Sequence, residues 1–250
     1  MTKLILSGCC GSMGKVVTSC AAADPDCKIV AGVDLKAHAD TSYPISSSFD
    51  QITEQADALI DFSNPSLLSS LLSFGIKHQL PLVLCTTGYS DKQKEEMRKA
   101  SETIPIFNSG NMSLGVNLLI ELSKLAAKAL GSSFDIEIVE MHHNRKLDAP
   151  SGTALMIADG ISDALGRNMN YVYDRHTQRK PRETNEIGIH SLRGGTVVGE
   201  HEVVFAGPQE TVTLSHSAQS RDIFANGALH AAKFIVGQAN GLYSMSDLLK

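Results

Sequence analysis

The stretch KLILSGCCGSMG, from Lys3 to Gly14, decides the fold at the start of the chain. A short apolar run, typical of a buried strand, leads into glycines at 8, 11 and 14, and a helical stretch follows to Ala23. The next apolar run, KIVAGV, ends just before Asp34. Glycines allow a tight turn and close approach of a pyrophosphate to the helix N-terminus, and a carboxylate about 20 residues later can bind ribose hydroxyls. The stretch therefore predicts a dinucleotide site, although a glycine turn alone is also typical of simple strand-to-helix packing.

The rest of the first third alternates strands and helices, as in a doubly wound parallel sheet. Small polar residues follow three successive strands, where open α/β sheets bind ligands. We expect an α/β fold with an N-terminal Rossmann-like sheet. Its predicted strands are Lys3–Ser7, Lys28–Val33, Ala58–Ser63, Pro81–Cys85 and Ile104–Phe107, and its helices Gly14–Ala23, Ser66–His78 and Ser90–Ser101, the last with a Ser90/Gln93 capping box.

The pattern changes after Phe107 and predicts a second α+β domain on a mixed or antiparallel sheet. A periodic helix and an alternating strand come first, then a long loop over 166–186, and three runs between 187 and 218 read as an antiparallel meander. The final helical stretch can return to the first domain. We expect residues 1–110 and 222–250 to bind the dinucleotide, and 111–221 to form the substrate-binding, catalytic and oligomerisation domain.

Composition places the protein among ordinary globular chains. It has 250 residues, 42% of them hydrophobic and 20% charged, with a formal net charge of −5. This predicts no nucleic-acid or membrane partner and a cytoplasmic location. The five cysteines have no zinc-like spacing, and His142 and His143 should point to opposite sides of a strand, so we expect no metal. Cys9 or Cys10 could instead be a redox-sensitive thiol.

The stretch EMHHNRKLDAPSGTA, from Glu140 to Ala154, concentrates proton-handling and anion-binding groups. Histidine titrates near neutral pH, and Lys146 can fix an anion or supply a proton. The Pro-Ser-Gly-Thr segment begins a helix, whose N-terminus favours anions. We expect His142 to be unpaired at the strand end, with a pKa near neutrality. Alternatively, a histidine at the strand end could simply hydrogen-bond its neighbours, and Lys146 could be a solvated surface charge.

This stretch resembles the E-x-H-H-x-x-K-x-D-A-P-S-G-T-A signature of the 4-hydroxy-tetrahydrodipicolinate (dihydrodipicolinate) reductase family, and the similarity extends over essentially the whole chain. The resemblance implies reduction of a cyclic imine dicarboxylate to tetrahydrodipicolinate by NADH or NADPH, in lysine and diaminopimelate biosynthesis, by a homotetramer. It implies His142 and Lys146 as catalytic residues and His143, Gly152 and Thr153 as substrate-binding ones. The implied cofactor contacts are Gly8, Gly11, Ser12, Met13, Asp34, Cys85, Thr86, Thr87, Ser109, Gly110, Asn111 and Met112.

The chain departs from the family pattern at Cys85, at Cys9 and Cys10, and in the segment NSGNM. None of these departures touches the catalytic signature. Two other functions stay open: another two-domain NAD(P)-dependent reductase, or a non-catalytic NAD(P)-sensing protein with structural histidines.

Overall fold

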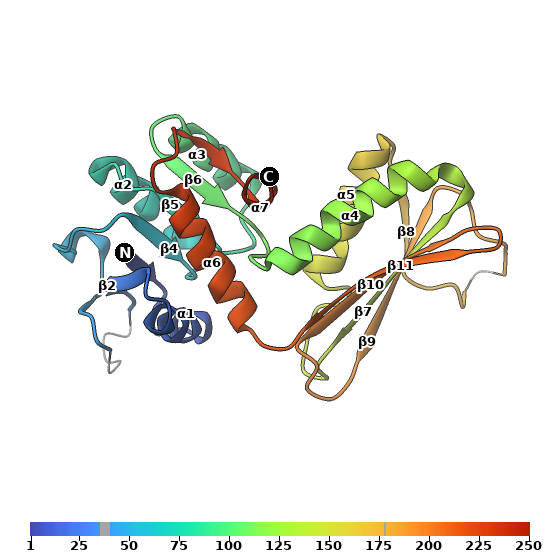
Figure 1. Cartoon of the computed structure of the whole chain (residues 1–250), viewed down its shortest axis with the longest axis horizontal. Helices are drawn as coiled ribbons and strands as arrows, with labels where there is room; N and C mark the ends of the chain where they lie inside the picture. The colour runs from blue at the N-terminus through green and yellow to red at the C-terminus, as the bar shows by residue number, and fades with distance from the viewer. Residues whose placement is uncertain (36–40, 178) are drawn as a thin grey trace. The chain divides into compact units, whose positions relative to one another are not determined.

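The computed structural model describes residues 1–35, 41–177 and 179–250. Two compact units divide the chain (Figure 1). The first comprises Met1–Leu114 and Arg221–Lys250, and the second is Gly115–Ser220. The chain therefore leaves the first unit and returns to it through its last 30 residues.

The first unit is built on a parallel sheet of seven strands in the order β12-β6-β5-β4-β1-β2-β3. Strand β1 lies centrally and pairs with β2 on one side and β4 on the other, so the strand order reverses there. Open sheets bind ligands at this switch point, and the glycine loop follows β1 directly. The expected Rossmann-like sheet is confirmed. Its strands are β1 Thr2–Ser7, β2 Cys27–Val33, β3 Ile45–Ser46, β4 Ala58–Asp61, β5 Leu82–Leu84, β6 Pro105–Asn108 and β12 Gly241–Tyr243.

Helices cover both faces of this sheet because successive strand residues point to opposite sides. Leu4 and Leu6 pack in a core with α1 (Ser12–Ala23) and α6 (Asp222–Ile235). Ile5, between them, packs in the other core with α2 (Leu68–His78) and α3 (Asp91–Ser101). The predicted capping box at the start of α3 is present, and the short helix α7 (Met245–Leu248) ends the chain.

The second unit has a mixed five-stranded sheet in the order β11-β10-β7-β9-β8. The predicted three-strand meander is wrong. Strands β10 and β11 pair antiparallel, but β9 pairs in parallel with β7 and β8, and β7 lies between β9 and β10. The helix α5 (Gly152–Leu165) lies in the crossover from β7 to β9, which a local pattern cannot reveal. The strands are β7 Asp135–His142, β8 Asn170–Val172, β9 Glu186–Arg193, β10 Gly199–Ala206 and β11 Thr211–Ala218.

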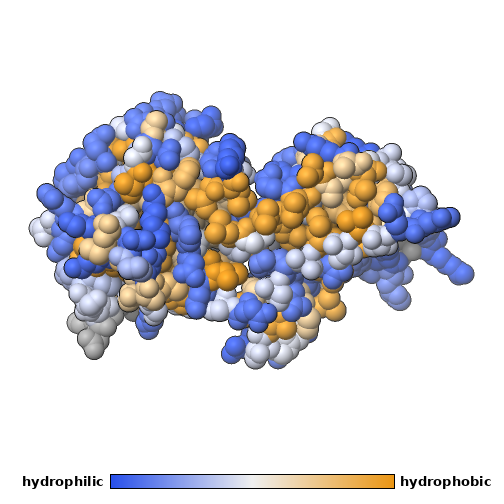
Figure 2. Space-filling model, viewed as in Figure 1, coloured by the Kyte–Doolittle hydropathy of each residue, from blue (hydrophilic) through white to orange (hydrophobic). Residues whose placement is uncertain are grey.

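One face of this second sheet packs against two helices. Ile136 and Ile138 of β7 share a core with α5 and with α4 (Leu114–Leu130). Alternate residues of β7 are only half-buried on the opposite face. Figure 2 shows apolar side chains gathered over α4, and three of its leucines are exposed: Leu118, Leu122 and Leu125.

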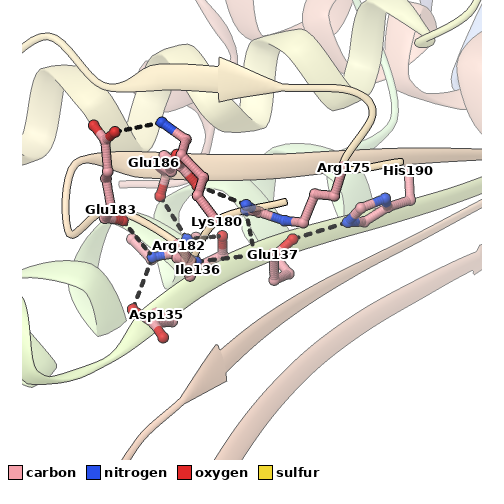
Figure 3. Close-up of polar contacts among 9 residues, drawn as sticks. All are labelled: Asp135, Ile136, Glu137, Arg175, Lys180, Arg182, Glu183, Glu186 and His190. Carbon is pink, nitrogen blue, oxygen red and sulfur yellow. Dashed lines mark hydrogen bonds and ion pairs between the residues drawn. The ribbon is translucent and has the colours of Figure 1, made fainter. Parts of the chain in front are cut away.

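The segment between α5 and β9 is predicted as one long loop, but it contains the strand β8, which pairs with β9. Ion pairs then tie the following polar segment to the sheet (Figure 3). Arg175 binds Glu186 at 2.8 Å, and Arg182 binds Asp135 at 2.7 Å and Glu137 at 3.1 Å. Charge pairing therefore holds a segment that has little apolar surface to bury.

Candidate active site

The glycine loop has a conformation that requires its glycines. Gly8 has φ of +75°, and a Cβ there would lie 2.6 Å from the carbonyl oxygen of Phe62. Gly11 is the N-cap of α1 and has no side chain to cover the free N–H groups of the first turn. The helix end can therefore receive the negative charge of a pyrophosphate.

A cavity of about 700 Å³ opens beside this loop. Asp34 lies at its wall, and the Cys10 N–H donates to its Oδ2 at 3.0 Å, so the carboxylate is tied to the loop. Phe49 and Phe62 supply apolar surface. These residues fit an adenosine, with a carboxylate for the ribose hydroxyls. Lys36, two residues after Asp34 in the sequence, is a candidate for binding a 2′-phosphate, but it lies outside the described residues.

A second cavity, of about 520 Å³, collects most of the other expected cofactor residues. The hydroxyls of two expected residues form hydrogen bonds within the protein. The Thr86 hydroxyl donates to the buried Asp61 at 2.7 Å, and the Ser109 hydroxyl donates to the Asn111 carbonyl at 2.7 Å. Ser109 is absent from the wall of this cavity. The expected residues that do line it are Met13, Cys85, Thr86, Thr87, Gly110, Asn111 and Met112.

Arg221, which the sequence did not indicate, also lines this second cavity. Its Nη1 donates to the Ser12 hydroxyl at 3.2 Å, which places a guanidinium at the start of α1. A positive charge there adds to the anion affinity of the helix end. Its position 209 residues after Ser12 explains why no local pattern indicates it.

In the second unit, Glu140 is the centre of a buried polar cluster. Its carboxylate is fully buried and accepts hydrogen bonds from both terminal nitrogens of Arg193, each at 2.8 Å. It also contacts His142 Nδ1 at 2.6 Å and accepts from the Ser151 N–H at 3.1 Å. Burial alone would raise the pKa of Glu140, but the hydrogen bonds from Arg193, Ser191 and His142 outweigh it and lower that pKa to about 2.

His142 is therefore paired, and the expectation of an unpaired histidine with a pKa near neutrality is wrong. Its pKa is lowered: burial is the largest single cause, Glu140 acts in the opposite direction, and the charges of Lys146 and Arg193 lower it as well. Because ionised Glu140 can only accept, the proton of neutral His142 lies on Nδ1 and the lone pair on Nε2. A Cβ at Gly199 would lie 3.0 Å from Nε2, so this glycine leaves the nitrogen uncovered on that side.

A second histidine, His201, completes the cluster. Its ring is 5.2 Å from that of His142 in an edge-to-face arrangement, and its Nε2 lies 2.9 Å from the Ser151 hydroxyl. Burial, and then the charge on His142, lower its pKa to about 4. Ser151 also caps α5 by accepting from the Ala154 N–H, so its hydroxyl helps to hold the start of this helix.

The remaining expected residues lie at the rim of this cluster. Lys146 Nζ is 2.9 Å from the Asp148 carboxylate. The His143 N–H donates to the Val197 carbonyl at 2.8 Å, and its buried Nδ1 has no hydrogen-bond partner among the residues that the structure describes. Gly152 is exposed at the start of α5 with open space around it, and half-buried Thr153 follows. Within the second unit, the structure thus brings together donors and a helix N-terminus that suit a carboxylate.

Comparison with known proteins agrees with this chemistry. The families described as dihydrodipicolinate reductase, N-terminus, and dihydrodipicolinate reductase, C-terminus, match residues 2–112 and 115–249. The chain belongs to the dihydrodipicolinate reductase family. The expected membership and reductase function are confirmed, and the family's reaction depends on NAD(P)H.

Curated relatives match over the full length of the chain. The 4-hydroxy-tetrahydrodipicolinate reductase of Caldanaerobacter subterraneus subsp. tengcongensis is 53% identical over 250 residues, which cover 100% of this chain and 99% of the relative. The protein of the same name from Clostridium novyi is 46% identical with the same coverage. Such full-length similarity shows the same family in both units.

Solved structures confirm the fold. A dipicolinate-bound dihydrodipicolinate reductase from Paenisporosarcina sp. TG-14 matches with a TM-score of 0.82 at 24% identity, covering 98% of this chain and 97% of that one. A probable dehydrogenase from Thermotoga maritima reaches 0.62 at 12% identity, covering 98% and 92%. Separately, no helix within residues 1–35, 41–177 and 179–250 has the length and apolar character to cross a membrane.

Proposed function

We propose that the chain reduces 4-hydroxy-tetrahydrodipicolinate, through dihydrodipicolinate, to tetrahydrodipicolinate, with His142 and Lys146 as its acid residues. The observation that carries this proposal is the buried Glu140 cluster, which fixes the ring of His142 beside a lysine and a helix N-terminus. Relatives bearing the name of this reductase, 53% and 46% identical over the full chain, support the same substrate.

The glycine loop, Asp34 and Arg221 are proposed to hold the dinucleotide. The α1 N-terminus and Arg221 meet the pyrophosphate, and Asp34 accepts from the adenosine ribose hydroxyls. Bound NADH or NADPH supplies the hydride. The second cavity, with Thr87 and Asn111 in its wall, then takes the nicotinamide end.

The rim residues of the second unit are proposed to hold the substrate carboxylates. Gly152 and Thr153 lie in the first turn of α5, where the helix dipole favours an anion. His143 offers its buried Nδ1, and Lys146 offers a positive charge. These donors suit a small dicarboxylate better than a neutral substrate.

Loss of the 4-hydroxyl group of the substrate as water gives the cyclic conjugated imine. After hydride addition at C4 of this imine, the ring is an enamine and takes up one proton. Lys146 can deliver this proton from its ammonium group. His142 can deliver it from Nε2 only after that nitrogen has taken up a proton, and the lowered pKa of the buried ring then makes the protonated form a stronger acid than an exposed imidazolium. Glu140 keeps the ring oriented and its Nδ1 protonated.

The decisive test mixes the purified protein with NADH and freshly generated substrate and follows nicotinamide absorbance. We expect substrate-dependent consumption of NADH. If NADH binds but is not consumed, the chain is a dinucleotide-sensing protein. If NADH is consumed with a different imine or keto substrate instead, the chain is another reductase on the same fold.

The choice of nucleotide rests on Asp34, whose carboxylate attracts ribose hydroxyls but repels a 2′-phosphate. We expect both nucleotides to be accepted and NADH to be used at least as well as NADPH. Steady-state kinetics with each nucleotide test this. A preference for NADPH above about tenfold, which is about 1.4 kcal/mol, contradicts it.

We also propose that the protein is a homotetramer assembled through the sheets of its second unit, as the family resemblance implies. Half-buried Val139 and Met141 on the helix-free side of β7, and the exposed leucines of α4, are apolar surfaces available for association. Sedimentation equilibrium should give four times the chain mass of 26.8 kDa. A monomer at micromolar concentration contradicts this proposal.

A further inference from the structure

Two thiols and a carboxylate converge inside the glycine loop. Cys9 and Cys10 have their sulfur atoms 4.0 Å apart. The two sulfurs and a carboxylate oxygen of Asp34 all lie within 4.8 Å of one another. The reduction proposed above uses neither thiol. The spacing of the cysteines in the sequence did not indicate a metal site, because the third group, Asp34, follows a different strand.

The fold creates this convergence in a specific way. Parallel pairing of β1 with β2 places Ser7 beside Val33, so the residues after both strands meet. The Cys10 N–H donates to Asp34 Oδ2 at 3.0 Å, which holds the carboxylate at the loop. Gly32 makes room for the buried thiol, since a Cβ there would lie 2.6 Å from Cys9 Sγ.

The geometry favours a bound metal over a disulfide. Tetrahedral Zn²⁺ with bonds of about 2.3 Å to sulfur separates two thiolates by about 3.8 Å, close to the 4.0 Å between Cys9 and Cys10. A disulfide needs about 2.05 Å and a Cα separation of roughly 4.4–6.8 Å, whereas adjacent residues are held about 3.8 Å apart. A cation could enter with little movement, but a disulfide would distort the loop.

We propose that Cys9, Cys10 and Asp34 bind one thiophilic divalent cation of the Zn²⁺ class, with a fourth position left for water. The bound cation and the dinucleotide exclude each other. This second statement rests on the proposed function, in which the glycine loop holds the pyrophosphate and Asp34 holds the ribose. The site would let such a cation inhibit the enzyme in competition with its nucleotide.

Cd²⁺ is a suitable probe, because thiolate coordination gives an ultraviolet charge-transfer band. The full chain, reduced with a phosphine and freed of metal, is titrated with Cd²⁺. We expect one equivalent per chain to produce the band. Cys10→Ser should weaken binding at least about tenfold, which is about 1.4 kcal/mol. Cys20→Ser is the matched control, because Cys20 is also half-buried but lies outside the cluster; it should bind as the wild type does.

The absence of a band, or equal affinity in the wild type and Cys10→Ser, overturns the site. Competition is tested separately by NADH titration. We expect saturating Cd²⁺ or Zn²⁺ to weaken NADH binding to the wild type at least about tenfold, and Cys10→Ser to lose this effect at the same metal concentration. A band with unchanged NADH affinity overturns the exclusion. Failure of the metal-free wild type to bind NADH would instead count against the proposed function.

Discussion

Strand β7 carries two glutamates, three residues apart, that organise two different clusters. Glu140 faces the helices, is fully buried, and binds Arg193 and His142. Glu137 faces the other side, is about a quarter exposed, and binds two arginines and a histidine (Figure 3). The residue types are the same in both clusters.

Burial explains why only one of these clusters suits catalysis. Around Glu137, both arginines also bind another acid: Arg175 binds Glu186, and Arg182 binds Asp135. Around Glu140, the groups depend on one another, so their protonation states and positions are coupled. A fixed ring with a shifted pKa is what proton transfer needs, whereas shared surface ion pairs serve to hold a segment in place.

The strongest test of the difference between the two clusters is to remove a histidine from each of them. We expect His142→Ala to lower kcat by about 10²–10⁴-fold, the usual effect of a positioned general acid, with NADH affinity changed less than about threefold. His190→Ala, which removes the histidine bound to Glu137, should leave kcat unchanged. Steady-state kinetics of both variants give the answer. A wild-type kcat in His142→Ala would refute the proposed mechanism.

The second test compares the two carboxylates. Glu140→Gln leaves the Arg193 guanidinium without its buried counter-charge, which should lower the free energy of unfolding by about 3–5 kcal/mol. Glu137→Gln leaves other acids beside both arginines and should cost under about 1 kcal/mol. Urea denaturation measures both variants. Equal losses would mean that burial does not distinguish the clusters.

These two clusters also show what a sequence can and cannot predict. Three features are local, so the spacing of their residues was enough to indicate them. They are the glycine loop, the capping box of α3 and the stretch from Glu140 to Ala154. Arg193 and His201 join Glu140 and Ser151 from strands about 50 residues further along the chain. Their arrival depends on β7 lying between β9 and β10, and this pairing order was predicted wrongly. The false expectation about the His142 pKa follows from the same missing contacts.

Lowering the pH should reduce the stability of the protein first through the buried Glu140 cluster. The pKa of His201 falls from 6.5 to about 4 on folding, so between these values the unfolded chain binds more protons. Stability should therefore fall as the pH drops from about 6.5 to 4, by up to about 3 kcal/mol from His201. Glu140, with its pKa lowered from 4.5 to about 2, adds a further loss between those values. His201→Asn should flatten the upper part of the curve. A pH dependence of stability equal to that of the wild type would contradict this assignment.

The smallest effect should come from adding one methyl group beside the catalytic ring. A Cβ at Gly199 would lie 3.0 Å from His142 Nε2, so the ring must move by a few tenths of an ångström. Because Glu140 holds the opposite nitrogen at 2.6 Å, the ring cannot retreat without lengthening that bond. We expect Gly199→Ala to lower kcat about tenfold, or about 1.4 kcal/mol, with KM nearly unchanged. The matched control is Gly195→Ala, in the connection that leads from β9 to β10, with open space around it. Since Gly195 has φ of +51°, alanine there should reduce stability and not kcat. Equal kcat values for the two variants would show that catalysis tolerates this shift of the His142 ring. Burial of the cluster, and not a fixed position of Nε2, would then account for the difference between the two clusters.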